Sequence, residues 1–332
     1  MPYKFNEPYR HKFEPLKYKV TNWREYNQAL KQRGNITLWF EEKTLRKWYA
    51  RPTHKPGAQR IYSNRAIEVA GIIRLVFHLP LRQTTGFLSS IAKLMGVDLR
   101  IPDFSTLSRR LKQLKVNLQV PSIKRGMHII IDTTGLSVYG ADEFHQTQNG
   151  LTRFKGYRKL HIVINEHQQI LTCELTTKHA DDKAQVTKLL RRVKSDYDTI
   201  IADGNYDDRK VYAAIKKYKC HKSVKNKKVA QCNIVIPPRC DAWPRKIKTR
   251  LYPKQRSEHV RYRTKHGRMN WQKATGYGER SLVEVTFYRY KKIIGQLMRS
   301  IDFKNQKVEA KLACKALNIM TELGMPITER IN

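Results

Sequence analysis

The sequence predicts an α/β protein in which a mixed β-sheet covered by helices follows an α-helical N-terminal region. Two observations predict this class. From residue 127 to 236, three apolar runs of strand length come first, and a helix–strand–helix–strand alternation follows, which indicates a mixed sheet with helices packed over it. From residue 61 to 120, apolar residues recur with helical spacing. The 332 residues, 40% of them hydrophobic, are enough to bury a sizeable core.

The elements of the expected sheet are short apolar runs bounded by polar or turn-forming residues. A turn at residues 165–168 suits a hairpin between the second and third strands. After the sheet, helices are expected from Tyr277 to Arg299 and from Lys304 to Leu323. The strands are expected at 128–131, 159–165, 170–176, 199–202 and 233–236, with helices at 183–193 and 208–219.

Two helices of the N-terminal region, expected at residues 84–95 and 105–114, have helix-turn-helix proportions. The turn between them is longer than the usual three or four residues. The second helix presents Arg109 and Lys112 beside an apolar face. We predict that this helix contacts DNA, although any solvated basic helix would show the same pattern.

The charge balance points to a polyanionic partner. The excess of 66 Lys and Arg over 28 Asp and Glu gives a formal net charge of +38. Because the charge is spread along the chain and no basic amphipathic helix dominates it, nucleic acid is favoured over a membrane surface. The longest apolar stretch, Ala66–Leu81, contains charged residues and is too short to span a bilayer. We therefore expect a soluble protein with no membrane partner.

The five cysteines are an odd number in a chain that shows no secretory leader. A disulfide framework is therefore not expected, and a cytoplasmic location in a bacterium, in association with the nucleoid, fits the composition. A zinc site formed by some of the cysteines with His259 or His266 is the alternative. Because the chain has no Cys-x-x-Cys and no short His pair, buried or surface thiols are the simpler interpretation.

A strongly basic segment, residues 237–276, interrupts the pattern after the last expected strand. It interleaves Arg and Lys with Trp243, Tyr252, Tyr262 and Trp271. Cationic groups bind phosphates while aromatic faces stack on exposed bases, so we predict a partly ordered insertion that contacts DNA. The alternative is a disordered basic loop.

A stripe of four residues near the C-terminus carries the strongest chemical signal: Tyr277, Arg280, Glu284 and Lys291. On a helix their offsets of 3, 7 and 14 residues fall within about 60° of one another. A face that mixes a carboxylate with cations suits two tasks, holding a divalent metal and binding the phosphate on which the metal acts.

Two aspartates are expected to complete a metal site with Glu284. Asp132 and Asp203 each follow a run typical of a buried strand. Taken alone, such an aspartate can equally be a turn residue that accepts hydrogen bonds from its own backbone. Three carboxylates together can hold two Mg²⁺ or Mn²⁺ ions, which activate an oxygen nucleophile on one side of a phosphorus and stabilise the leaving oxygen on the other. The set therefore indicates phosphodiester chemistry.

Other carboxylates fit this site less well. Asp198 begins its strand and so lies at the opposite edge of the sheet. Asp207 and Asp208 are expected to cap the helix that follows them. Glu279 lies about 140° from Glu284 around the helix and should face elsewhere.

These motifs resemble those of the DDE transposases of bacterial insertion sequences, most closely the IS-five family. The resemblance covers roughly residues 125–300 and rests on Tyr-x2-Arg-x3-Glu-x6-Lys, on Asp132-Thr-Thr-Gly and on Asp203-Gly-Asn-Tyr-Asp. Lys159-Leu-His on the second strand is similar as well, and RGNITLWF near Trp39 more loosely so. The resemblance implies a ribonuclease-H-like catalytic domain.

The resemblance also implies roles for individual residues. Asp132, Asp203 and Glu284 would be catalytic and would bind two magnesium ions, for which manganese substitutes. Arg280 and Lys291 would contact phosphates of the transposon end, with Tyr277 supporting them; the alternative is that Arg280 and Lys291 only neutralise Glu284. Some related transposases stack a flipped base on an aromatic residue, for which the candidate here is Trp271.

The sequence thus predicts a transposase that binds terminal inverted repeats, cleaves the DNA ends by metal-dependent hydrolysis and joins the 3′-hydroxyl ends to target DNA. Its partners would be double-stranded DNA and further copies of itself, in a homodimer or higher assembly. The alternatives are a structure-selective endonuclease or resolvase on the same fold and a domesticated, non-catalytic DNA-binding protein. The expected domains are 1–60 (basic segment), 61–120 (helical DNA-binding region), 121–303 (catalytic domain with the 237–276 insertion) and 304–332 (C-terminal helix).

Overall fold

A computed structural model describes residues 17–331 except 41, 53–55, 119, 121–125, 140–143, 148–149, 154–155, 221–231, 240 and 244–253. Internal contacts divide the chain into two compact units. The smaller unit consists of Met1–Leu38 and Ile319–Asn332, and the larger of Trp39–Asn318.

The smaller unit joins an N-terminal and a C-terminal strand. Strand β1 (Lys17–Val20) pairs antiparallel with β9 (Thr328–Ile331). Helix α1 (Trp23–Arg33) follows β1, and its last residue, Arg33, donates a hydrogen bond from Nη2 to the carbonyl oxygen of Gly324 at 2.7 Å. The sequence patterns predicted neither strand.

The larger unit begins with helices. The first of its long helices starts at Asn64, because the Ser63 hydroxyl accepts a hydrogen bond from the amide of Ala66 and so caps the helix. A nine-residue connection, 95–103, separates the last two of these helices, as expected of the pair with helix-turn-helix proportions. The helices are α2 (Ile36–Trp39), which starts in the smaller unit, α3 (Glu42–Leu45), α4 (Asn64–Val76), α5 (Leu81–Leu94) and α6 (Phe104–Leu111).

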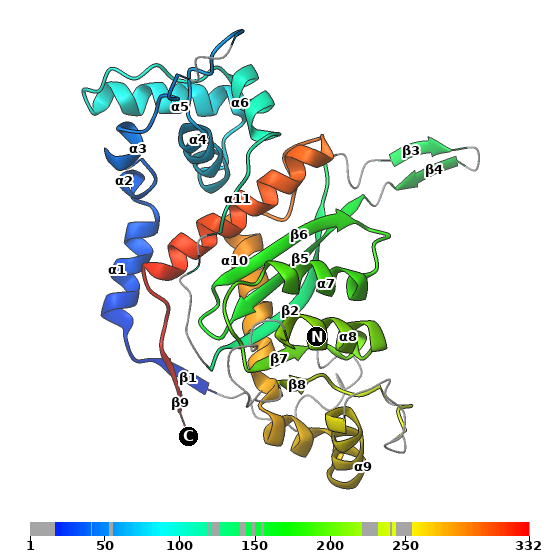
Figure 1. Cartoon of the computed structure of the whole chain (residues 1–332). Helices are drawn as coiled ribbons and strands as arrows, with labels where there is room; N and C mark the ends of the chain where they lie inside the picture. The colour runs from blue at the N-terminus through cyan, green and yellow to red at the C-terminus, as the bar shows by residue number, and fades with distance from the viewer. Residues whose placement is uncertain are drawn as a thin grey trace. The chain divides into compact units, whose positions relative to one another are not determined.

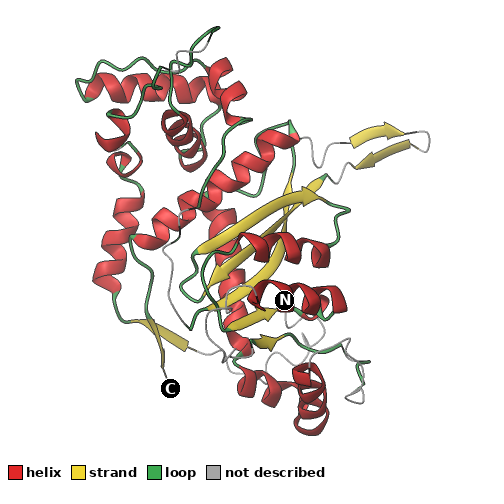
Figure 2. Cartoon of the chain, viewed as in Figure 1, coloured by secondary structure: helices red, strands yellow, loops and turns green. Residues whose placement is uncertain are grey.

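A five-stranded mixed sheet forms the centre of the larger unit, with the strand order β6-β5-β2-β7-β8 (Figures 1 and 2). Strand β5 pairs antiparallel with both β6 and β2, whereas β7 pairs in parallel with both β2 and β8. This is the ribonuclease-H-like mixed sheet that the sequence predicts. The strands are β2 (His128–Ser137), β5 (Tyr157–Asn165), β6 (Ile170–Thr177), β7 (Thr199–Ala202) and β8 (Asn233–Val235).

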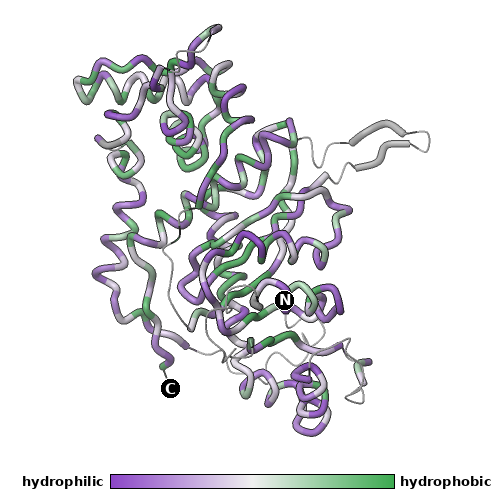
Figure 3. Tube along the Cα trace, viewed as in Figure 1, coloured by the Kyte–Doolittle hydropathy of each residue, from purple (hydrophilic) through white to green (hydrophobic). Residues whose placement is uncertain are grey.

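Helices cover both faces of this sheet. Helices α7 (Asp182–Arg192) and α8 (Arg209–Cys220) pack on one face over a core that includes Ile129 and Ile131, since alternate residues of a strand share a face. Helices α10 (Ser281–Ile293) and α11 (Phe303–Glu322) lie on the other side. The central strands include hydrophobic stretches of the trace in Figure 3, as expected for strands buried on both faces.

The helix expected from Tyr277 to Arg299 is shorter in the structure and starts as a 3-10 turn, and a separate, broken helix precedes it. Helix α9 (Lys254–Thr275) is broken at Gly267, whose φ of 79° lies outside the helical range. The 3-10 helix η3 (Tyr277–Arg280) leads directly into α10. The helix then ends at Ile293 instead of Arg299, because Gly295 adopts a φ of 108° that glycine tolerates without strain.

Two short elements and the expected insertion complete the description. Strands β3 (Phe144–Thr147) and β4 (Gly150–Arg153) form a hairpin, and the 3-10 helix η2 (Gly204–Tyr206) follows β7. The second half of the predicted insertion is the ordered helix α9, whereas residues 244–253 lie outside the described part of the chain. Among the described helices, none is both long and apolar enough to cross a membrane.

Candidate active site

Two of the predicted carboxylates are neighbours at one edge of the sheet. The pairing of the parallel strands β2 and β7 ends with Ile131 opposite Ala202. Asp132 and Asp203 are the next residues of the two strands, so the register places them beside each other. The sequence suggested that the strand ends just before Asp132. In the structure β2 continues beyond it, because β5 keeps Asp132 paired opposite Ile162.

The third carboxylate reaches Asp132 through an arginine. Arg280 is the last residue of η3, and its Nη1 donates a hydrogen bond to Oδ2 of Asp132 at 3.0 Å. Its Nη2 donates to Oε1 of Glu284, one turn later in α10. One guanidinium therefore joins Asp132 to Glu284, and its contact with Asp132 spans 148 residues of sequence.

The environment of Asp132 disfavours its charged form. Burial raises the pKa of Asp132 to about 6, and the nearby carboxylates of Asp203 and Glu284 act in the same direction. The Thr133 amide, which donates to Oδ1 at 2.8 Å, and the Arg280 guanidinium oppose this rise of the pKa. A buried carboxylate among other carboxylates is a site that favours an added cation.

Hydrogen bonds on the opposite side of β2 fix the strand at Asp132. The Thr133 hydroxyl lies 2.8 Å from Nδ1 of His161 and 2.9 Å from the Tyr206 hydroxyl. Nε2 of His161 lies 2.8 Å from the hydroxyl of Thr176 on β6. The network thus joins β6, β5, β2 and η2. The sequence marked His161 only through the resemblance of Lys159-Leu-His, and Thr176 gave no signal.

Tyr277 and Trp271 pack against each other next to these carboxylates. Their ring centroids are 5.4 Å apart, and His259 packs on Trp271 at 5.5 Å. Burial raises the pKa of Tyr277 to about 12, so the hydroxyl stays protonated. Trp271 is 0% exposed. It therefore has no free face on which a base could stack in this conformation, and we do not propose that role for it.

Two models of the transposase DDE domain match the chain, over residues 31–141 and 124–319, and the second covers more than half of the 332 residues. The chain belongs to the DDE transposase family. Among solved structures, it is similar to the Drosophila P element transposase strand transfer complex, with 14% identity and a TM-score of 0.26. That match covers 65% of this chain and 47% of the other, so the chain spans about half of that protein's length.

Membership in the DDE family implies dependence on a divalent metal ion, and the predicted carboxylates have the donor chemistry that such an ion needs. Asp132, Asp203 and Glu284 offer the carboxylate oxygens that hard divalent cations prefer. Within the described ranges, no three His, Cys, Asp or Glu side chains are close enough together to hold a metal. The guanidinium of Arg280 instead supplies the positive charge between Asp132 and Glu284. Cys173, Cys232 and Cys314 are buried and form no disulfide.

The remaining predicted DNA contacts differ in their availability. Lys291, two turns beyond Glu284, makes no hydrogen bond or ion pair with any residue that the structure describes, so it does not neutralise Glu284. Arg109 on α6 is exposed and also unpaired in the described part. Lys112 forms an ion pair with Asp302 at 3.2 Å. Among the predicted DNA contacts, Arg109 and Lys291 are therefore more available to bind a phosphate than Lys112.

The rival carboxylates are engaged elsewhere. Asp208 caps α8 as expected, since its Oδ1 accepts from the amide of Lys210 at 2.9 Å. Glu279 faces away from Glu284 and lies 2.8 Å from Nδ1 of His128.

The expectation that Asp207 caps the same helix is wrong. Its carboxylate is buried and accepts two hydrogen bonds from Arg256 of α9, at 2.6 and 2.7 Å. It also accepts from the Tyr212 hydroxyl at 2.9 Å. A buried carboxylate needs charge-paired donors more than an exposed helix end needs a cap.

Proposed function

We propose that the protein is the transposase of a bacterial insertion sequence of the IS-five group. It would bind the terminal inverted repeats of that element, cleave the DNA ends hydrolytically and join the 3′-hydroxyl ends to target DNA. Two contacts in a member of the DDE family support the proposal: the β2–β7 register, which sets Asp132 beside Asp203, and the Arg280 guanidinium, which bridges Asp132 and Glu284. The spacing from Tyr277 to Lys291 supports the subgroup.

In this proposal Asp132, Asp203 and Glu284 hold two Mg²⁺ ions, for which Mn²⁺ substitutes. When bound, such ions activate an attacking oxygen and stabilise the leaving oxygen of a phosphodiester. The protein orients the carboxylates through backbone amides: Thr133 donates to Asp132, and Gly204 donates to Asp203. Both bonds leave the second oxygen of each aspartate for other partners.

Arg280 would have two successive partners. In the free protein its guanidinium balances the charge of Asp132 and Glu284. Cations bound between the carboxylates would take over this role and release Arg280 to bind a DNA phosphate, as guanidinium groups do readily. Lys291, already unpaired within the described residues, would bind a second phosphate, and the buried Tyr277 would support Arg280.

The domains would share the recognition of DNA. The helical region, 61–120, would contact the element ends through Arg109 and Lys112, while residues 121–303 would carry the chemistry. Residues 1–60 would add basic charge, and residues 304–332 would contribute most of helix α11 and the strand β9 that follows it. Two or more copies would assemble on the DNA in the bacterial cytoplasm.

Cleavage of defined DNA tests this proposal. Inverted repeats flanking the reading frame would be labelled and incubated with the protein and Mg²⁺. We expect cuts at the repeat ends, followed by joining to a target plasmid. Cuts that follow DNA structure and ignore the repeats would favour the endonuclease, and binding without cuts would favour the domesticated protein.

A further inference from the structure

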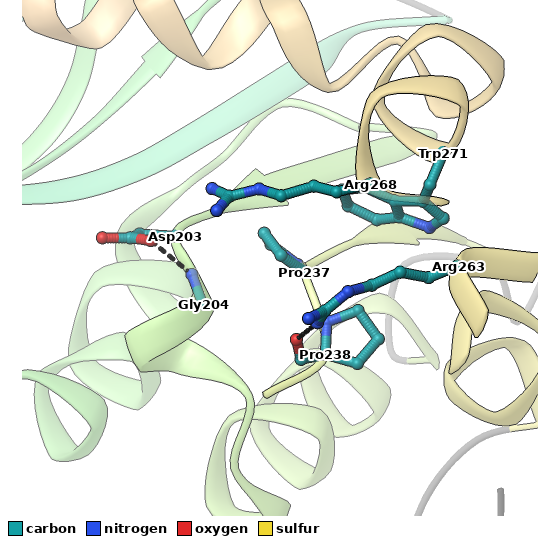
Figure 4. A pocket seen from close by; sticks show the side chains of 7 residues that line it. All are labelled: Asp203, Gly204, Pro237, Pro238, Arg263, Arg268 and Trp271. Atoms are coloured by element: carbon teal, nitrogen blue, oxygen red, sulfur yellow. Dashed lines mark hydrogen bonds between the residues drawn. The ribbon is translucent and has the colours of Figure 1, made fainter. Parts of the chain in front are cut away.

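A pocket of about 190 Å³ opens beside Asp203, outside the three carboxylates themselves. One wall comes from the start of η2 and from the loop after β8, and the other from α9 (Figure 4). The proposed function gives this space no role. Its lining residues are Asp203, Gly204, Pro237, Pro238, Arg263, Arg268 and Trp271.

Two arginines make the pocket suited to an anion. Arg263 is held in place because its Nη1 donates to the backbone carbonyl of Pro238 and, at 3.3 Å, to that of Arg239. Arg268 makes no hydrogen bond or ion pair with the described part of the chain, and its side chain extends toward Asp203 (Figure 4). The Asp203 carboxylate lies at the far end from Arg263. Two guanidiniums against one carboxylate favour a negatively charged ligand.

A buried donor without an acceptor lies in the same pocket. Trp271 is 0% exposed, yet its Nε1–H has no hydrogen-bond partner among the residues that the structure describes. Buried N–H groups are nearly always paired, and leaving one unpaired destabilises the folded protein. Because an indole N–H only donates, the missing partner is an acceptor such as an oxyanion.

We propose that this pocket binds a phosphate group of the DNA backbone, with Arg268 as its main charged contact and the Trp271 N–H as a neutral donor, which a small shift of the buried ring would bring to the phosphate. The inference rests on the proposed function, since it places a second phosphate beside the carboxylates that would act on the first. Guanidinium groups and an N–H donor match the oxygens of a phosphate diester, whereas a base would need an exposed stacking face that Trp271 does not offer.

The indole N–H of Trp271 provides a direct readout by NMR. Full-length protein labelled with ¹⁵N-tryptophan would be titrated in EDTA with inorganic phosphate and with a short DNA duplex. The Trp271 signal is identified by its absence in Trp271→Phe. If that variant does not fold, single replacements of the other four tryptophans identify the signal by elimination.

We expect both probes to move the Trp271 signal downfield. Arg268→Gln should weaken phosphate binding at least about tenfold, because it removes the charged contact. Arg261→Gln is the matched control, since Arg261 is exposed on the same helix but does not line the pocket, and it should weaken binding less than about twofold.

Two results would overturn the inference. One is a Trp271 signal that the duplex does not move, and the other is equal weakening by Arg268→Gln and Arg261→Gln, which would indicate general charge attraction only. The assay contains no metal and no cleavage step. A protein that binds phosphate in this pocket but cuts no DNA would refute the proposed transposase function and support the phosphate site. A protein that cuts the repeat ends but binds no phosphate in this pocket would support the transposase function and refute the phosphate site.

Discussion

Directly behind Asp132, the hydrogen-bond directions around His161 can be assigned from the network. The Thr176 hydroxyl donates to the carbonyl of Thr177 at 3.3 Å, so it accepts from Nε2–H of His161. Nδ1 of His161 then accepts from the Thr133 hydroxyl, which in turn accepts from Tyr206. The imidazole is therefore neutral, in agreement with burial lowering the pKa of His161 to about 4.

This lowered pKa predicts a loss of stability in acid. Between pH 6.5 and about 4 the unfolded chain binds a proton on His161 and the folded chain does not, so the free energy of unfolding falls as the pH falls through this window. The contribution of His161 should be about 2–3 kcal/mol. Chemical unfolding at several pH values should show a flatter profile for His161→Gln than for the wild type.

The comparison needs two controls. Asp132, whose pKa is raised, changes stability with the opposite sign in part of this window, so only the difference between variant and wild type isolates His161. His167→Gln removes a histidine whose side chain is 66% exposed and should keep the wild-type profile. Parallel profiles for His161→Gln and the wild type would refute the assignment of a buried neutral imidazole.

Arg280 yields a prediction about metal binding. Because its guanidinium must leave Asp132 and Glu284 before cations replace it, Arg280→Gln should lower the melting temperature in EDTA and increase the stabilisation by Mn²⁺. Thermal melts with and without Mn²⁺ measure both effects. Lys291→Gln, on the same stripe but unpaired in the described structure, should leave the Mn²⁺ shift unchanged. If Mn²⁺ raised the melting temperature equally in the wild type, Arg280→Gln and Lys291→Gln, the replacement of the Arg280 guanidinium by cations would be contradicted.

At the scale of elements, a buried ion pair attaches α9 to the sheet domain. Asp207 and Arg256 have side-chain exposures of 0% and 9%, and the pair joins the end of η2 to the first turns of α9. Removing one partner leaves a buried charge uncompensated, so Asp207→Ala should destabilise the protein by about 3–5 kcal/mol. Denaturant unfolding measures the loss.

A surface ion pair serves as the matched control. Glu42 and Arg46 are 74% and 76% exposed at the same 2.6 Å separation, and Glu42→Ala should cost less than about 1 kcal/mol. If Asp207→Ala costs no more than Glu42→Ala, the pair does not hold α9 in place.

The elements also show what local patterns can predict. The five strands and the helices α7 and α8 follow from apolar periodicity, and so does the edge shared by Asp132 and Asp203, because register follows from parallel pairing. The contacts of Arg280 with Asp132 and of Arg256 with Asp207 bridge 148 and 49 residues and leave no local signal. The β1–β9 pairing is missed for the same reason.

For Trp271 the local sequence pattern suggested exposure, whereas the structure shows burial. An aromatic residue in a basic segment suggested a surface that stacks on bases. Tertiary packing buries the ring between Tyr277 and His259, and only the structure shows which of its groups remains unpaired.

For the whole molecule, the charge of +38 predicts a DNA affinity that depends steeply on salt. Each neutralised phosphate releases counterions, so binding to a short duplex should weaken by about 10³-fold or more between roughly 50 and 200 mM salt. Arg109→Gln should lower the slope of log K against log salt by about one unit, and Lys112→Gln by less because Asp302 already pairs with Lys112. Fluorescence anisotropy measures both slopes, and an unchanged slope for Arg109→Gln would remove α6 from the DNA interface.

The most direct test of the whole account is cleavage of the element's ends by carboxylate variants. Asp132→Asn, Asp203→Asn and Glu284→Gln should each reduce Mg²⁺-dependent cleavage by several orders of magnitude, because the three groups act as a unit, while DNA binding persists. Glu279→Gln alters a neighbouring carboxylate that faces His128 and should cut at close to the wild-type rate. Near wild-type cleavage by any of the three site variants would contradict the account.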